Sequence, residues 1–130
     1  MNPITKVAVD EVPANTRRGG EIRVVLSPKT AGATGGFMGV LTLRPGEYVS
    51  AHYHPYSEEF VYLVDGVVTM LVDGAQAELR KGEGVVIPKN ARHRIENRGD
   101  AVATAVFHLC PLAPRPDLGH VNTEPLPAEA

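Results

Sequence analysis

Three histidines and a carboxylate are the residues of this chain whose types and spacing could do chemistry. His52 and His54 are separated by one residue, and His93 lies far downstream. Side chains alternate between the two faces of a strand, so His52 and His54 would point the same way and converge on one ion. The sequence therefore predicts a metal site with the ligands His52, His54, Glu59 and His93.

Two neighbouring carboxylates compete for the fourth position. Glu58 and Glu59 follow the short turn after His54 and begin the next expected strand. Alternation with Val61 and Leu63 places Glu59 on the inner face and Glu58 on the outer face. A bulge after His54 would exchange the two.

The expected ligand set mixes imidazole nitrogen with carboxylate oxygen. Such a set suits one divalent ion and leaves one or two positions open for water or substrate. We take zinc as the expected metal, while Mn, Fe, Ni, Co and Cu stay open. A His-x-His pair by itself is a weak signal, and the surrounding turns and strands strengthen it.

The elements that must position these residues are short strands separated by turns. The chain has 130 residues with 13 Gly and 11 Pro, which fits one turn-rich domain. Asp73-Gly74 is typical of a type I′ hairpin turn. Besides the strand that carries His52 and His54, the expected strands are 22–26, 37–43, 59–64, 67–72, 75–79, 84–87, 94–96 and 102–109.

This pattern predicts an all-β fold closed into a barrel, which removes exposed sheet edges. Residues 1–20 read as an N-terminal arm, 21–112 as the barrel and 113–130 as a Pro-rich C-terminal tail. The prolines of the tail predict an extended or mobile end without strand or helix. His120, within this tail, is expected to be solvated.

Composition excludes several classes of protein. The net charge of −2 argues against nucleic-acid binding. Cys110 is a single cysteine, so no internal disulfide can form. No stretch approaches the roughly 20 apolar residues of a membrane span, and the N-terminus shows no secretory segment. We therefore expect a cytoplasmic protein with no membrane or nucleic-acid partner.

Two motifs carry a family resemblance. Residues 46–66 resemble the first cupin motif, G-x5-H-x-H-x4-E-x6-G, and residues 82–97 resemble the second, G-x5-P-x-G-x2-H-x3-N. The second motif departs at Asn90, where the family usually has Gly. Asn tolerates a left-handed backbone, so the turn should survive. The resemblance implies a single-domain cupin barrel, the jelly-roll-like double-stranded β-helix.

A narrower resemblance covers most of residues 15–115. The segments 17–20, 31–39 and 52–62 resemble the cupin-type cyclases of bacterial aromatic polyketide pathways, including tetracenomycin, resistomycin and spore-pigment types. The resemblance implies antibiotic biosynthesis, in which a metal stabilises the enolate of a 1,3-dicarbonyl during an aldol-type cyclisation and aromatisation. The poly-β-ketone substrate would be free or held on an acyl carrier protein, which Arg17 and Arg18 could face.

An apolar cavity would hold the substrate in one folded pose. The expected substrate-binding residues are Phe37, Met38, Leu41, Leu43, Val61, Leu63, Met70, Val86 and Phe107. A general base is also required, and a metal-bound hydroxide or His108 could serve. If the face that carries Val102, Thr104 and Val106 points inward, His108 reaches the cavity and could also act as a further metal ligand; otherwise it is a structural histidine.

Other functions compete with the cyclase. An iron site of this type permits oxygen activation, so a cupin oxygenase is the first alternative. A sugar or keto-acid isomerase would require more polar groups inside the barrel. A non-catalytic metal-binding or small-molecule-binding cupin is the third.

Apolar residues of the N-terminal arm further predict a homodimer; these are Ile4, Val7, Val9 and Val12.

Overall fold

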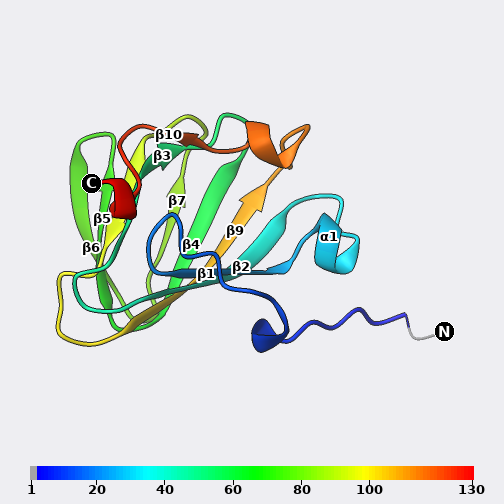
Figure 1. The fold of residues 1–130 in the computed structure, drawn as a ribbon, viewed down its shortest axis with the longest axis horizontal. Coiled ribbons are helices and arrows are strands. Elements are labelled where there is room, and N and C mark those ends of the chain that lie inside the picture. The colour runs from blue at the N-terminus through cyan, green and yellow to red at the C-terminus, as the bar shows by residue number, and fades with distance from the viewer. Residues whose placement is uncertain (1–2) are drawn as a thin grey trace.

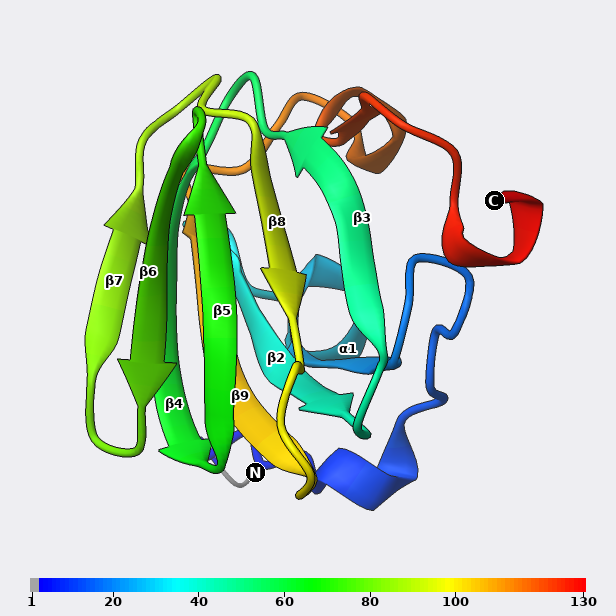
Figure 2. The ribbon, with the colours of Figure 1, turned by 90° about the vertical axis from the view of Figure 1, so that its left-hand side faces the viewer.

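The computed structural model describes residues 3–130 and shows two antiparallel sheets that face each other (Figures 1 and 2). The strands are β1 (Glu21–Leu26), β2 (Phe37–Leu43), β3 (Tyr48–Tyr53), β4 (Glu58–Asp65), β5 (Val67–Val72), β6 (Ala75–Arg80), β7 (Gly84–Ile87), β8 (His93–Glu96), β9 (Ala103–Cys110) and β10 (Val121–Asn122). Helical segments are short: η1 (Val9–Glu11), α1 (Pro28–Ala31), η2 (Pro116–Leu118) and η3 (Pro127–Glu129). The predicted all-β fold is confirmed.

Each sheet has five strands. The first has the order β1-β2-β9-β4-β7 and the second β10-β3-β8-β5-β6. Asp73 and Gly74 both have positive φ, 48° and 84°, as the predicted type I′ turn between β5 and β6 requires. The strands thus alternate between sheets along much of the chain, which brings distant segments to one interior.

The hydrophobic core fills the space between the sheets. Leu63 is fully buried at 0% exposure on β4, and Leu43 on β2 is 1% exposed. On each strand, every second residue lies on the same face as these two leucines and points into the core. The core cluster also includes Val49, Val61, Val68, Met70, Leu79, Ile87, Ile95, Ala105, Phe107 and Leu109.

The turns of both motifs depend on left-handed residues. Gly46, Gly66 and Gly82 have φ between 83° and 86°. Asn90 also has positive φ, 68°, which confirms that Asn supports the turn in which the family usually has Gly. Asn97 is 1% exposed, and its side-chain amide donates to the carbonyl oxygens of Leu43 at the end of β2 and Ala101 before β9. Its backbone N–H and carbonyl bond to Glu47 and Gly46, which ties the start of β3 to the end of β8.

The C-terminal tail corrects the prediction that its prolines allow no strand or helix. The tail forms β10, which pairs with β3 so that Asn122 lies opposite His52. The Ala51 backbone N–H donates to the Glu124 carboxylate at 2.5 Å, and the Ser50 hydroxyl donates to a tail carbonyl at 3.0 Å. Proline removes backbone donors, but β3 supplies donors and acceptors that hold the tail against the second sheet.

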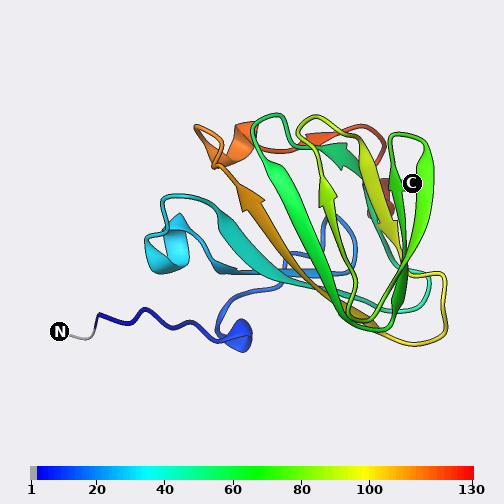
Figure 3. The same ribbon diagram turned by 180° about the vertical axis from the view of Figure 1, so that it is seen from behind.

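The N-terminal arm divides into two parts. Val12 is 8% exposed and packs against its own chain, and the Arg18 carbonyl accepts from the Ser50 amide. Residues 3–8 run away from the barrel, whereas η1 lies close to β1 (Figure 3). Residues 1 and 2 of the predicted arm lie outside the described residues. In the part that the structure describes, no helix combines the length and apolar character that a membrane crossing requires.

Candidate metal centre

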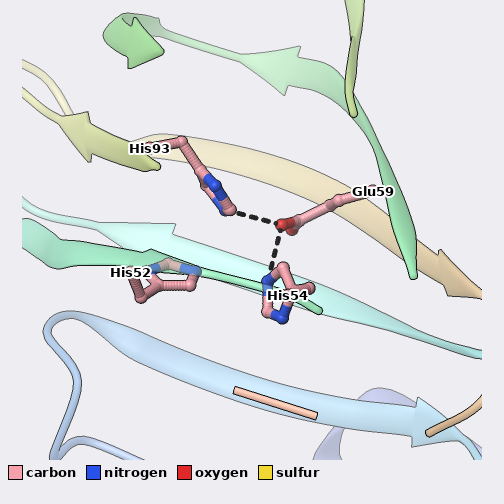
Figure 4. A group of neighbouring side chains, drawn as sticks. All are labelled: His52, His54, Glu59 and His93. Carbon is pink, nitrogen blue, oxygen red and sulfur yellow. Dashed lines mark hydrogen bonds and ion pairs between the residues drawn. The ribbon is translucent and has the colours of Figure 1, made fainter. Parts of the chain in front are cut away.

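Three strands from both sheets bring the four predicted ligands together (Figure 4). His52 and His54 come from β3 and its end, His93 begins β8 directly opposite His52, and Glu59 projects from β4. One ligand atom from each residue lies within 4.8 Å of the others. We call this group the donor cluster: His52, His54, Glu59 and His93.

Backbone carbonyl oxygens fix the orientation of all three imidazoles. Because a carbonyl oxygen can only accept, each Nδ1 must carry a proton, and this leaves Nε2 as the nitrogen that can bind a metal. Such support for the far side of the ring is the usual arrangement around metal-binding histidines. The Nδ1 atoms of His52, His54 and His93 lie 2.7, 2.8 and 2.9 Å from the carbonyl oxygens of Ser50, Gly119 and Ala91, respectively.

The Glu59 carboxylate completes a donor set that fits a cation. Its Oε1 lies 3.2 Å from Nε2 of His54 and 3.0 Å from Nε2 of His93. These contacts bring two imidazole nitrogens and one carboxylate oxygen to the same point. Three imidazoles and one carboxylate are a donor set that fits a divalent metal ion.

Burial and neighbouring groups set the protonation of two members of the donor cluster, His52 and Glu59. Burial, and then the neighbouring His93 and His120, lower the pKa of His52 to about 2. Burial alone raises the pKa of Glu59, but its contacts with His54 and His93 outweigh this and hold the pKa below its usual range. His52 is therefore a neutral ligand and Glu59 an anionic one.

The neighbouring carboxylate lies on the other side of the sheet. Glu58 is exposed, whereas the Glu59 side chain is only 13% exposed and enters the interior. The β4–β9 register is continuous from Glu58 to Leu63 and shifts only after it. No bulge therefore exchanges Glu58 and Glu59. The turn after His54 is held instead by the Asn90 amide, which donates to the His54 carbonyl.

An apolar cavity with about 120 Å³ of interior space that water can enter adjoins the donor cluster. The structure brings five predicted substrate-binding residues to its wall: Phe37, Leu41, Val61, Met70 and Phe107. Leu43 and Leu63 are buried in the core cluster but do not line the cavity.

Three predicted site residues lie elsewhere: Met38, Val86 and His108. For His108 the reason is that the inward face of β9 is the one that carries Phe107. Ala103, Ala105, Phe107 and Leu109 are buried, so Thr104, Val106 and His108 face outward. His108 contacts the ring of Phe60, with centroids 6.1 Å apart, on the outer face. Met38 pairs with His108 across the sheet, and Val86 is 54% exposed. None of the three reaches the cavity, so His108 cannot act there as base or ligand.

Sequence reasoning missed several residues that line the cavity. One of them is Val49, which simple alternation along the strand would assign to the face opposite His52. The β3–β8 register shifts between Val49 and His52, so both reach the cavity. The other residues that were not predicted are Asn15, Arg18, Ile22, Val24, Ile87, Ile95, Ala105, Leu109 and His120.

His120 corrects the expectation of a solvated tail residue. Its ring stacks on that of His52, with centroids 4.2 Å apart and planes inclined by 13°. Burial, followed by the charge of Arg18, lowers the pKa of His120 to about 4. No local pattern could have placed it here, because its position depends on the pairing of β10 with β3.

The fold and the donor cluster define a cupin. The family model of the cupin domain matches residues 39–109, more than half of the chain, so the chain belongs to the cupin family. A solved Klebsiella pneumoniae protein with a double-stranded β-helix domain has a TM-score of 0.73 and 19% identity. The match covers 95% of this chain and 99% of the Klebsiella pneumoniae chain, and it shows that the two share a fold.

More similar relatives come from Streptomyces. Protein SchB of Streptomyces halstedii is 61% identical over 91% of this chain and 86% of its own. Polyketide synthase CurC of Streptomyces cyaneus is 55% identical over 91% of this chain and 77% of its own. Tetracenomycin polyketide synthase protein TcmJ of Streptomyces glaucescens is 46% identical, covering 96% and 84%. The predicted resemblance to polyketide-associated cupins is confirmed.

Proposed function

We propose that this cupin is a metal-dependent polyketide cyclase that closes and aromatises a poly-β-ketone by aldol-type condensation and dehydration. One observation carries the proposal: a donor cluster suited to a divalent cation adjoins a largely apolar cavity. The likeness to proteins named as polyketide synthase components supports the same substrate class.

The donor cluster would hold the metal. A divalent ion bound there would act as a Lewis acid that polarises a carbonyl oxygen and favours loss of a proton from the methylene between two carbonyls. We propose zinc, because three imidazoles and one carboxylate suit its ligand preferences. The carbonyls of Ser50 and Ala91 hold two of the imidazoles in place before the substrate arrives.

The cavity wall supplies regiochemistry. Phe37 and Phe107 meet edge to face, with centroids 6.4 Å apart, and Met70 lies 3% exposed on the opposite sheet. A poly-β-ketone can fold in many ways, and apolar walls that admit one pose raise the effective concentration of a single carbon–carbonyl pair. The same walls exclude bulk water, which would compete for the carbonyl oxygens.

The cavity also weighs against an isomerase. Enzymes that act on polar sugars or keto acids require several polar contacts to the substrate, because buried hydroxyl and carboxylate groups need partners. Apart from the donor cluster, the polar residues on this wall are few, namely Asn15, Arg18 and His120. The remaining wall residues are aliphatic or aromatic, and they suit a substrate that is less polar than a sugar or a small keto acid.

The test is a reconstituted reaction. Purified protein loaded with zinc is added to a minimal polyketide synthase that releases an uncyclised poly-β-ketone, and the products are identified by mass spectrometry and NMR. We expect one cyclised aromatic product with the metal-loaded protein and a mixture of spontaneous products with chelator-treated protein. Oxygen consumption is followed in parallel. Product formation that requires oxygen would instead indicate an oxygenase.

We also propose a homodimer. Residues 3–8 project from the barrel, and Val9, which follows them at the start of η1, is 41% exposed. On the outer face of the first sheet, Phe60 and Tyr62 are 42% and 52% exposed, which is unusual for large aromatic residues in a monomer. Light scattering at micromolar concentration should show two copies, and a monomer would contradict the proposal.

An acyl carrier protein is the proposed partner during catalysis. Arg17 is exposed, and the next residue, Arg18, lines the cavity. Arg17 could therefore contact an acidic carrier surface near the cavity. Arg17→Glu should raise KM for carrier-bound substrate and leave KM for a free analogue unchanged. Equal effects on both substrates would show that the substrate is released before it binds.

A further inference from the structure

Arg18 is a cation without a partner in the cavity wall. Its backbone is fixed, since its carbonyl oxygen accepts from the Ser50 amide and Gly19 follows it closely packed against Tyr48. Yet within residues 3–130 its guanidinium has no hydrogen bond and no ion pair, although the side chain is half-buried. Placing such a group against an apolar wall costs free energy unless water or a ligand completes its hydrogen bonds, and a ligand in the cavity can do so.

His120 offers the opposite hydrogen-bonding character in the same cavity. Its Nε2–H donates to the Asn122 Oδ1 at 2.8 Å, so Nδ1 keeps its lone pair. That Nδ1 is buried and has no hydrogen-bond partner among the described residues. Stacking on His52 holds the ring plane in place. His120 is therefore a preoriented acceptor beside the donor cluster.

The two groups together match one chemical unit. The enol of a 1,3-dicarbonyl has a hydroxyl that donates and a second oxygen that accepts, and the enolate carries negative charge on its oxygens. Arg18 provides donors and positive charge, and His120 provides an acceptor. A saturated ketone offers no hydroxyl donor, so it would satisfy Arg18 and leave His120 unpaired.

We propose that Arg18 and His120 form a subsite that binds the enol form of a 1,3-dicarbonyl, with Arg18 on the acceptor oxygen and His120 on the enol hydroxyl. This inference rests on the proposed function and names the part of the substrate that these residues recognise. The subsite selects enolised chains, and the tail and the N-terminal segment each contribute one of its residues. Neither residue belongs to the donor cluster.

The experiment measures binding of pentane-2,4-dione, a small enolisable 1,3-diketone, to metal-loaded protein by calorimetry. The comparison compound is 3,3-dimethylpentane-2,4-dione, which cannot form the enol between its carbonyls. Metal content is measured after each titration by elemental analysis. Wild type should bind the enolisable diketone at least tenfold more tightly than the dimethyl compound.

The variants have matched controls. Arg18→Gln and His120→Phe should each weaken binding of the enolisable diketone by roughly tenfold, the effect expected from one hydrogen bond of moderate strength. Arg17→Gln removes the adjacent exposed charge, and His108→Phe makes the same change on the outer face; both should bind within about twofold of wild type. Arg18→Lys should recover part of the loss, because it restores the charge.

Each result bears on the inference. Unchanged affinity in Arg18→Gln and His120→Phe, no preference of wild type for the enolisable compound, or loss of metal from His120→Phe would overturn it. A folded variant is verified by circular dichroism, and Arg18→Lys serves where Arg18→Gln does not fold. Failure of cyclisation in the reconstituted reaction, with the expected diketone affinities, would refute the cyclase function and leave the subsite intact.

Discussion

The two faces of strands β4 and β9 carry similar residue types and have opposite roles. On the inner face, Glu59 joins the donor cluster and Phe107 lines the cavity. On the outer face, the exposed Glu58 is the sequence neighbour of Glu59, and His108 contacts Phe60 away from the cavity. A carboxylate or an imidazole is available on both faces, so residue type alone does not define the site.

This difference shows that the site depends on side chains from both sheets meeting at one point. Inner-face side chains meet those of the opposite sheet, and their burial removes the water that would weaken charge interactions. Outer-face side chains stay beside solvent, where opposing charges are screened. The following predictions compare residues on the two faces, beginning with the largest expected effect.

The largest effect should come from loss of one inner imidazole. His93→Ala or His52→Ala removes one of four ligands, so metal affinity should fall by more than the 10- to 100-fold that loss of a supporting contact usually costs. Metal content after dialysis, measured by elemental analysis, checks this. Stoichiometric metal in both variants would show that the donor cluster is assigned wrongly.

Next, substitutions of the two adjacent glutamates should have clearly different effects on metal affinity. Glu59→Gln removes a buried anion that balances the metal's charge, and metal affinity should fall roughly tenfold or more. Glu58→Gln changes an exposed residue on the outer face and should alter affinity by less than about twofold. Competition with a chromophoric chelator measures both affinities. An equal loss in the two variants would contradict the register of β4.

Packing on the two faces of β4 should differ as well. Leu63 is 0% exposed and Val64 is 43% exposed. Leu63→Ala should lower the free energy of unfolding by about 2–5 kcal/mol, because it leaves a cavity between the sheets. Val64→Ala should change it by about 0.5 kcal/mol or less. Urea unfolding of both metal-loaded variants provides the comparison.

The smallest effect is a pH dependence of the metal-free protein. An unfolded chain protonates His52 near its ordinary pKa of 6.5, whereas the folded chain, with a pKa of about 2, does not. The unfolded state then binds more protons, so the free energy of unfolding should fall by about 1.4 kcal/mol per pH unit below 6.5 and be unaffected above it.

Urea unfolding of chelator-treated protein at pH 7, 6 and 5 measures this dependence. His52→Phe removes the titrating group and should flatten the decline between pH 6 and 5. A decline of unchanged slope in His52→Phe would show that other groups cause it. His120→Phe should flatten it by a similar amount, because a folded-state pKa of about 4 still leaves His120 unprotonated between pH 6 and 5.

The local spacing of the sequence was enough for most of the fold and for the proposed ligands. Alternation along β3 predicts that His52 and His54 share a face, and a left-handed Asn90 predicts the turn before His93. Short strands and Asp-Gly turns predict the hairpin of β5 and β6, which the structure shows with the same strand limits for β5. These features depend on contacts between residues close in sequence.

Tertiary structure decided the features that depend on distant segments. Both faces of β9 carry apolar residues, so only its packing between β2 and β4 shows that His108 faces outward. Proline spacing predicts a tail without strands, yet β3 offers unpaired backbone groups that the tail satisfies, and this places His120 on His52. The register shift beside Val49 likewise arises from pairing with β8. The sequence by itself determined which residues could bind a metal. The long-range pairing of strands determined which other residues surround these residues, because the free energy of burial and of non-local hydrogen bonds cannot be read from local spacing.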